Sequence, residues 1–136
     1  MRTNNYPIAI VGLGTMGEGI TQTIASAGYS VRIFDISESK TKEALKNISK
    51  RLKELVDKDK LSSQKRIKIL ENISPVKNLN DLAHSKLIIE SIIEDLISKQ
   101  NIFCKLESIV SENAILATNT SSIDLNIISR KLKYPE

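Results

Sequence analysis

The sequence has few of the residues from which covalent or metal-based scaffolds are built. Its 136 residues include one cysteine, Cys104, and this count excludes an internal disulfide and a cysteine-based metal cage. Cys104 follows Phe103 in an amphipathic stretch, so we interpret it as a small buried hydrophobic residue and not as a reactive thiol. Aromatic residues make up only 4% of the chain, which predicts an aliphatic core. We expect no metal site.

Long hydrophobic runs are also missing. No segment comes near the roughly 20 consecutive apolar residues that a membrane-spanning helix needs. Residues 1–7 pass directly into a strand-like run and contain no hydrophobic region of the kind found in signal peptides. These absences predict a cytoplasmic protein without a membrane contact.

The net charge of +4 suggests an anionic partner. The basic residues gather mainly in residues 40–68, where acidic residues are interspersed among them. Such mixing is typical of a solvated helix face and not of a DNA-binding stripe. We therefore expect no nucleic-acid partner, and an anionic small molecule such as a phosphorylated cofactor is the better candidate.

Short apolar runs alternate with helical patterns along the chain. Gly28 is placed to end the first helix, and Ser37 is placed to cap the second. Strands are expected at residues 8–11, 30–34, 73–76, 86–90 and 114–117. Helices are expected at residues 16–27, 37–56, 95–110 and 123–132, with a further one ending near residue 70. The alternation predicts a single α/β domain over residues 1–136, a Rossmann-type doubly wound parallel sheet covered on both faces.

A glycine-rich turn follows the first expected strand and opens the first helix. Its residues are Gly12, Leu13, Gly14, Thr15, Met16 and Gly17. Three glycines at this spacing are weak evidence alone, but a strand before them and a helix after them are the context that a dinucleotide site requires. The first glycine permits the tight turn, the second lets the backbone approach a pyrophosphate, and the third lets the helix lie close to the strand. The free N–H groups at the helix start would then receive the pyrophosphate.

Asp35 stands 18 positions after Gly17, at the end of the next strand. An acidic residue there accepts hydrogen bonds from the adenosine ribose 2′-OH and repels a 2′-phosphate, which favours NAD over NADP. Arg32 points to the opposite face of the strand, so we do not expect it to bind a phosphate. Two alternatives stay open: glycines that serve turns alone, with Asp35 as a strand-end cap, and a site for FAD or another nucleotide.

Four motifs in the expected order resemble those of one family, and the resemblance runs through nearly the whole chain. They lie at residues 12–20, 34–36, 88–94 (with Lys99 five positions later) and 119–123. Their sequences are similar to the NAD-binding, N-terminal domain of L-3-hydroxyacyl-CoA dehydrogenases, which include bacterial 3-hydroxybutyryl-CoA dehydrogenases. The resemblance implies NAD as the cofactor, an acyl-CoA as the substrate, and a place in fatty-acid or butanoate metabolism.

The resemblance also implies roles for individual residues. The glycine turn would line the pyrophosphate and Asp35 the ribose, while Glu94 and Lys99 would contact the cofactor on its nicotinamide-ribose side. Ser121 would lie between the nicotinamide and the 3-oxygen of the substrate and help to polarise that oxygen, with Asn119 in the same loop. From the residues alone, the favoured interpretation of Glu94 and Lys99 is a charge at a helix start and a surface lysine. The loop at 119–122 can equally be a helix N-cap.

The long basic helical pair at residues 37–70 resembles the helical insertion by which the family approaches coenzyme A. Lys53, Lys58, Lys60 and Lys65 are candidate phosphate contacts there, and the sequence does not distinguish among them.

The catalytic base of the family is not among these residues. The family carries a histidine, oriented by a downstream glutamate, on the strand after the segment that residues 119–122 match, and the sequence given ends at Glu136. Its one histidine, His84, falls in an expected loop on another element, so we interpret it as a loop residue. We therefore expect the C-terminal catalytic and dimerisation domain to be absent, this chain alone to be inactive, and a homodimer only for a full-length protein.

Three functions remain in competition. The first is the NAD-binding part of a 3-hydroxyacyl-CoA dehydrogenase, which transfers hydride between NAD(H) and the C3 carbon of a 3-hydroxyacyl or 3-ketoacyl thioester. The second is a stand-alone NAD-binding module without catalysis. The third is a related dehydrogenase for carnitine or another hydroxy acid.

Overall fold

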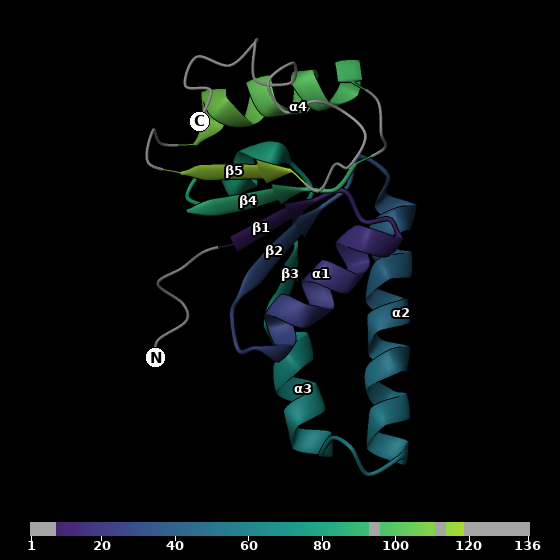
Figure 1. Ribbon diagram of the computed structural model, residues 1–136. Coiled ribbons are helices and arrows are strands. Elements are labelled where there is room, and N and C mark those ends of the chain that lie inside the picture. The colour runs from purple at the N-terminus through teal and green to yellow at the C-terminus, as the bar shows by residue number, and fades with distance from the viewer. Residues whose placement is uncertain (1–7, 93–95, 111–113, 119–136) are drawn as a thin grey trace.

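The apolar runs form a five-stranded sheet with helices on both faces (Figure 1). The computed structural model describes residues 8–92, 96–110 and 114–118. The strands are β1 (Ile8–Val11), β2 (Val31–Phe34), β3 (Ile73–Pro75), β4 (Leu87–Glu90) and β5 (Ile115–Thr118). Their order in the sheet is β3-β2-β1-β4-β5, and all neighbouring pairs are parallel. The predicted doubly wound α/β class is confirmed.

Three helices lie on one face of the sheet, and α4 lies on the other (Figure 1). The helices of the first face are α1 (Thr15–Ser26), α2 (Glu38–Asp57) and α3 (Ser63–Glu71). The opposite face carries α4 (Leu96–Ile109), which contacts the short 3-10 helix η2 (Leu79–Leu82). No pattern in the sequence predicts η2, because four residues are too few to show a helical period. The helix expected at 123–132 lies outside the described residues.

Local capping signals fix where the helices begin and end. The Ser37 side chain accepts a hydrogen bond from the Lys40 backbone N–H and so caps α2, as expected. Ser62 caps α3 in the same way, by accepting from the N–H of Lys65. Gly28 follows α1 with a φ of +99°, in the left-handed region that ends helices and favours glycine.

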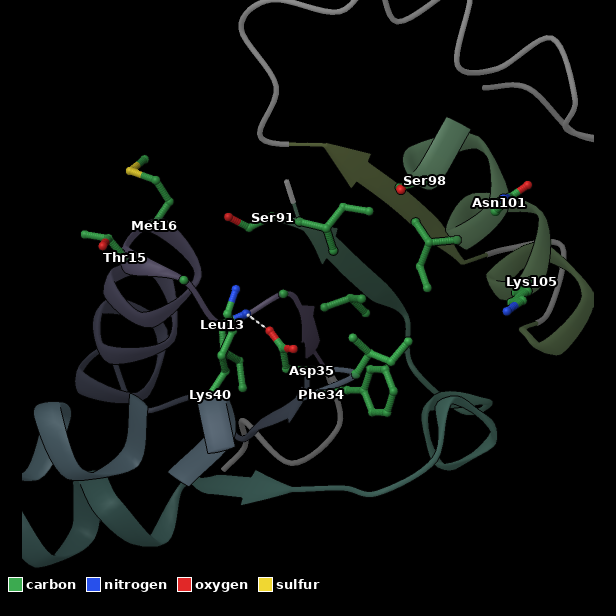
Figure 2. A pocket seen from close by; sticks show the side chains of 16 residues that line it. Leu13, Thr15, Met16, Phe34, Asp35, Lys40, Ser91, Ser98, Asn101 and Lys105 are labelled. Atoms are coloured by element: carbon green, nitrogen blue, oxygen red, sulfur yellow. Dashed lines mark hydrogen bonds between the residues drawn. The ribbon is translucent and has the colours of Figure 1, made fainter. Parts of the chain in front are cut away.

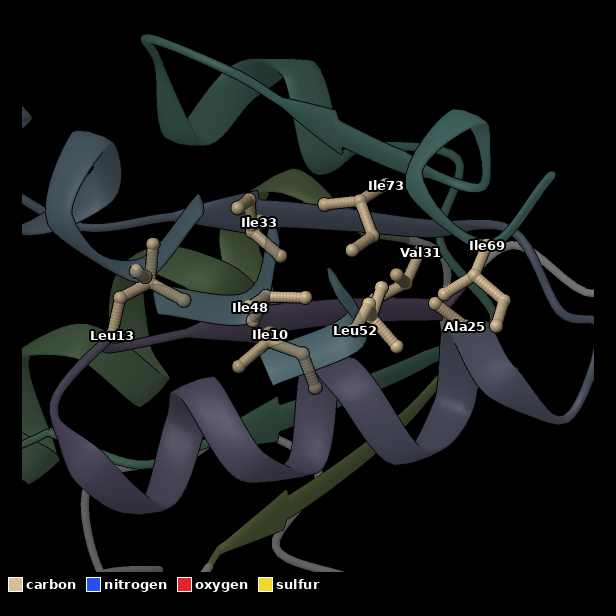
Figure 3. Packing of buried hydrophobic residues seen from close by; sticks show 10 residues of the cluster. Ile10, Leu13, Ala25, Val31, Ile33, Ile48, Leu52, Ile69 and Ile73 are labelled. Carbon is tan, nitrogen blue, oxygen red and sulfur yellow. The ribbon is translucent and has the colours of Figure 1, made fainter. Parts of the chain in front are cut away.

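The alternation of side chains along β1 divides the hydrophobic core in two. Successive strand residues point to opposite faces, so Ile10 joins the cluster beneath α1, α2 and α3, while Ala9 and Val11 join the cluster beneath α4 and η2. Figure 3 shows side chains from the sheet meeting those of the helices in the first cluster, among them Ile10, Val31, Ile33, Ile73, Ile48, Leu52 and Ile69. The buried members of both clusters are aliphatic, as the low aromatic content predicts.

The strand order creates a crevice at one edge of the sheet. From β1 the chain moves outward to β2 and β3, and then returns past β1 to β4 on its other side. The loops that follow β1 and β4 therefore leave the sheet in opposite directions, and ligands bind at such switch points, beyond the carboxyl ends of the strands. The glycine turn follows β1 and Ser91 follows β4, so both lie at this point.

Helices α2 and α3 form a hairpin that packs against α1. Ala44, Ile48 and Leu52 recur every four residues on α2 and are buried toward the core, which is the helical period expected for one apolar face. Arg66 of α3 holds the two helices together, because its guanidinium donates to the Ser49 hydroxyl of α2 over 2.7 Å.

The four candidate coenzyme A contacts, Lys53, Lys58, Lys60 and Lys65, are all exposed. No helix in the described part of the chain is long and apolar enough to cross a membrane.

Candidate cofactor site

Gly12 ends β1 in a conformation that other residues adopt only under strain. Its φ is +100°, and its N–H donates to the carbonyl oxygen of Phe34 over 2.9 Å. A Cβ atom at this position would lie 2.5 Å from the carbonyl oxygen of Ser91, in the loop that follows β4. Gly12 is therefore required both by the backbone turn and by the close approach of a second loop.

Gly17 lets the first turn of α1 rest on the end of β1. A Cβ atom at Gly17 would overlap the carbonyl oxygen of Gly12, and it would also touch the side chain of Ile10. The third glycine thus allows the close packing of helix and strand that the sequence predicts.

Gly14 differs from both, because none of the described residues requires it to be glycine. It is the N-cap of α1, with φ −74° and ψ −166°, which is extended backbone that any residue adopts. A Cβ atom there would meet no atom of the described part of the chain within 4 Å, and the residue lines a pocket. The remaining physical reason for a glycine is the close approach of a ligand to the backbone at the helix start.

The carboxylate of Asp35 is held at the edge of this pocket by the backbone. Its Oδ2 accepts the N–H of Leu13 in the glycine turn over 2.8 Å (Figure 2). Its Oδ1 accepts the N–H of Ser37, also over 2.8 Å. These two bonds fix the side chain and leave its remaining lone pairs for a ligand hydroxyl. Arg32 lies elsewhere, donating to the carbonyl oxygen of Asp81, which confirms that it points away from Asp35.

The pocket lies between the start of α1 and α4, with Phe34, Asp35 and Ser91 between them (Figure 2). Its volume is about 720 Å³, within the range of about 300–1,000 Å³ that small-molecule and cofactor sites occupy. The glycine turn lines it from Gly12 to Met16, and Gly17 lies behind that wall. Among the described residues, those that line it are Val11, Gly12, Leu13, Gly14, Thr15, Met16, Phe34, Asp35, Ile36, Lys40, Ser91, Ile92, Ser98, Asn101, Ile102 and Lys105.

The family model described as 3-hydroxyacyl-CoA dehydrogenase, NAD binding domain, matches residues 7–136. The chain belongs to this family. Its members bind NAD. The glycine turn and Asp35 lie together at one pocket, where the sequence predicts that the pyrophosphate and the ribose of that cofactor bind. The family of this NAD-binding domain is therefore the one that the four sequence motifs resemble.

The relatives of the domain are longer dehydrogenases. It is 37% identical over 129 residues to 3-hydroxybutyryl-CoA dehydrogenase of Clostridioides difficile, a match that covers 95% of this chain and 46% of that protein. It is 35% identical over 136 residues to 3-hydroxyadipyl-CoA dehydrogenase of Escherichia coli (strain K12), covering 100% of this chain and 29% of that protein. The crystal structure of (S)-3-hydroxybutyryl-CoA dehydrogenase from Ralstonia eutropha is similar with a TM-score of 0.90 and 32% identity, covering 95% of this chain and 46% of that one. The chain thus spans less than half the length of the relatives it matches.

Lys99 of the NAD-binding domain lies behind the pocket wall. Its side chain is fully buried, and its Nζ lies 2.5 Å from Oε2 of Glu90, which is also fully buried at the end of β4. Lys99 is not among the residues that line the pocket. Its contact with the nicotinamide ribose, like the cofactor contacts of the other motif residues, stays a prediction.

Several residues expected in the site lie outside the described residues. These are Glu94, Asn119 and Ser121. His84 is described, and it lies in an exposed turn after η2, away from the pocket lining. No group of three or more histidine, cysteine, aspartate or glutamate side chains that could hold a metal ion occurs within residues 8–92, 96–110 and 114–118.

A polar network between α1 and α2 has no counterpart in the sequence predictions. Glu18, in the first turn of α1, is buried and accepts hydrogen bonds from Arg51 over 2.6 Å and from Asn47 over 3.1 Å. Arg51 also donates to Gln22 over 2.7 Å. This network holds the hairpin of α2 and α3 against α1, the helix that begins at the glycine turn. A separation of 33 residues between Glu18 and Arg51 leaves no local signal by which the pair could be found.

Proposed function

We propose that this domain holds NAD(H) for hydride transfer to and from the C3 carbon of a 3-hydroxyacyl-CoA or 3-ketoacyl-CoA. The observation that carries the proposal is the pairing of Gly14 with Asp35 across one pocket. Gly14 has no side chain, so a ligand in the pocket can approach the backbone at the start of α1. Beside it lies the carboxylate of Asp35, which a hydrogen bond from the Leu13 N–H holds in place. Bound NAD would supply the carbon that accepts or donates the hydride.

The residues of the chain divide the work of binding. The first N–H groups of α1 would hydrogen-bond the pyrophosphate, and the positive end of the helix dipole favours that negative charge. The Asp35 carboxylate would accept from the ribose hydroxyls and repel a 2′-phosphate, so NAD is favoured over NADP. By resemblance, Ser121 would polarise the 3-oxygen of the substrate.

An acyl-CoA substrate is supported by the names of the relatives, which include dehydrogenases of 3-hydroxybutyryl-CoA and 3-hydroxyadipyl-CoA. We propose that catalysis of the hydride transfer requires a histidine–glutamate pair outside these 136 residues. We also propose that a full-length protein is a homodimer. Fatty-acid or butanoate metabolism is the corresponding setting.

The binding half of the proposal is tested by titrating the chain with NADH and with NADPH while following nucleotide fluorescence. We expect NADH to bind about a hundredfold more tightly, because Asp35 and a 2′-phosphate carry charges of the same sign. Equal affinities would overturn the role given to Asp35, and no binding of either nucleotide would overturn the function itself.

The catalytic half is tested by the oxidation of NADH in the presence of acetoacetyl-CoA. We expect no turnover from the 136-residue chain and turnover from a protein that carries the histidine–glutamate pair. In that longer protein, Ser121→Ala should lower turnover with little change in the melting temperature. Unchanged turnover would remove Ser121 from the mechanism.

A further inference from the structure

Two lysines are among the described residues that line the cofactor pocket. Lys40 lies in the first turn of α2, and Lys105 lies on α4. Figure 2 shows Lys40 and Asp35 on the side of the glycine turn and Lys105 across from them. Neither lysine has a role in the proposed function. Lys40 is of interest because it shares its side of the pocket with Asp35, the residue proposed to select the nucleotide.

Hydrogen bonds through Ser37 fix the backbone of Lys40 relative to the carboxylate of Asp35. Oδ1 of Asp35 accepts the N–H of Ser37 over 2.8 Å. The N–H of Lys40 donates to the carbonyl oxygen of Ser37 over 3.1 Å and to its Oγ over 3.4 Å. The carboxylate and the lysine thus belong to one hydrogen-bonded turn at the start of α2. A ribose that Asp35 binds would therefore have its 2′ substituent near the Lys40 side chain, which lines the same pocket.

The described fold gives no reason for a lysine at this position. The first turn of a helix is the positive end of its dipole, where a cation is unfavourable. Lys40 is exposed, and it forms no ion pair with another described residue. Glu38 and Glu43, the acids nearest to it along the chain, do not line the pocket. The ammonium group of Lys40 is thus available to a ligand that enters the pocket.

We propose that Lys40 binds the 2′-phosphate of NADP(H), so that Asp35 sets the preference for NAD and Lys40 limits it. A 2′-phosphate at this place meets a like charge on Asp35 and an opposite charge on Lys40. An ammonium on a flexible stem binds phosphate as a point charge and needs no fixed geometry. NAD has a hydroxyl in place of that phosphate and offers the lysine no charge. The inference rests on the proposed function, because it takes the adenosine ribose to lie at Asp35.

A general attraction of Lys40 for anionic nucleotides is the competing explanation. Such an attraction would act on the pyrophosphate, which NADH and NADPH share, and it would raise both affinities by the same factor. A contact with the 2′-phosphate would raise the affinity for NADPH alone. The ratio of the two dissociation constants therefore separates the two roles.

The test compares Asp35→Asn with the double variant Asp35→Asn, Lys40→Met, because NADPH binding is easier to measure once the carboxylate is removed. We expect the loss of Lys40 to weaken NADPH about tenfold and NADH less than about twofold, as measured by nucleotide fluorescence. Equal weakening of both nucleotides would overturn the proposal in favour of a general attraction. Unchanged affinity for NADPH would overturn it as well, because the lysine would then remain in solvent.

Lys40→Arg in the same background keeps the positive charge and should retain most of the affinity for NADPH. A loss as large as that caused by Lys40→Met would contradict the proposal, since the charge would then not be the cause.

Lys42→Met is the matched control. It removes another exposed lysine from the start of the same helix, outside the pocket lining, and should leave the ratio of the dissociation constants unchanged. A change as large as that of Lys40→Met would overturn the proposal, because the net charge of the domain would then select the nucleotide. Both lysines are exposed, so neither substitution removes a buried side chain. Failure of the parent to bind either nucleotide would overturn the proposed function and this inference with it. Binding by the parent, with no effect of Lys40 on the ratio, would overturn this inference alone.

Discussion

Gly14 and Gly17 stand three residues apart at the start of α1, and their surroundings are opposite. A Cβ atom at Gly17 would overlap the backbone of Gly12, whereas one at Gly14 would meet no atom within 4 Å in residues 8–92, 96–110 and 114–118. The turn therefore has a packed side, made by Gly12 and Gly17, and an open side, made by Gly14 and the carboxylate of Asp35. The packed side is required by the fold, and we attribute the glycine on the open side to the approach of the proposed ligand.

The difference shows that one sequence motif can combine two unrelated requirements. A substitution on the packed side should lower the stability of the domain, and one on the open side should lower its affinity for the cofactor. Measuring unfolding and NADH binding on the same variants therefore tests whether the two sides are separable.

The largest effect is expected on the packed side. Gly17→Ala should lower the free energy of unfolding by about 3 kcal/mol or more, because backbone atoms of Gly12 must move to admit the methyl group. Urea denaturation followed by circular dichroism measures this change. A loss under about 1 kcal/mol would mean that the helix start adjusts easily, and the distinction between the two sides would fail.

Gly14→Ala should have the next largest effect, and it should appear in binding alone. We expect NADH affinity to fall about a hundredfold, which corresponds to about 2.7 kcal/mol, since the methyl group would occupy the space into which the pyrophosphate fits. The free energy of unfolding should stay within about 0.5 kcal/mol of the parent value, because the backbone conformation suits alanine. Undiminished NADH affinity would place the pyrophosphate elsewhere.

Asp35→Asn tests the charge on the open side. We expect the preference for NADH over NADPH to fall by about tenfold, or about 1.4 kcal/mol, because the amide no longer repels a 2′-phosphate. The ratio of the two dissociation constants is the measurement, since Asp35 also holds the N–H groups of Leu13 and Ser37 and its loss should weaken the site in general. An unchanged ratio would mean that another group selects the nucleotide.

Gly19→Ala is the matched control within the same helix and should have the smallest effect. A Cβ atom at Gly19 would meet nothing within 4 Å, and the residue lies inside α1 and outside the lining of the cofactor pocket. Alanine should raise the free energy of unfolding by about 0.5–1 kcal/mol, because it loses less conformational entropy in a helix than glycine does. NADH affinity should not change. A fall in affinity would show that the open side reaches further along α1 than the pocket indicates.

Much of the fold could be predicted because its signals are local. Five apolar runs became the five strands, and Gly28 and Ser37 ended and began helices at the positions where they were expected. The glycine turn and Asp35 were found together because their spacing along the chain already encodes a strand, a turn, a helix and a second strand.

The other parts of the pocket have no comparable signal. Ile92, Ile102 and Lys105 line it only because β4 lies beside β1 in the sheet and α4 covers the sheet next to the pocket, and no period or spacing marks them. Lys99 shows the limit from the other direction. From the residues alone, a lysine within a helix is interpreted as an exposed residue, and the fold places it in the interior beside Glu90. Its cofactor contact, which the family resemblance implies, stays a prediction.

The sequence by itself determined the order of the helices and strands, the doubly wound class, and the glycine motif that is predicted to bind NAD, since each depends on residues close together in the chain. Only the tertiary structure decided which glycines pack against other residues and which one faces the pocket. It also decided which acidic side chain pairs with Arg51 and which with Lys99. The physical reason is that these properties belong to contacts between distant segments. Gly12 meets Ser91, Glu18 meets Arg51, and the pocket takes its shape where such contacts hold two loops and two helices together.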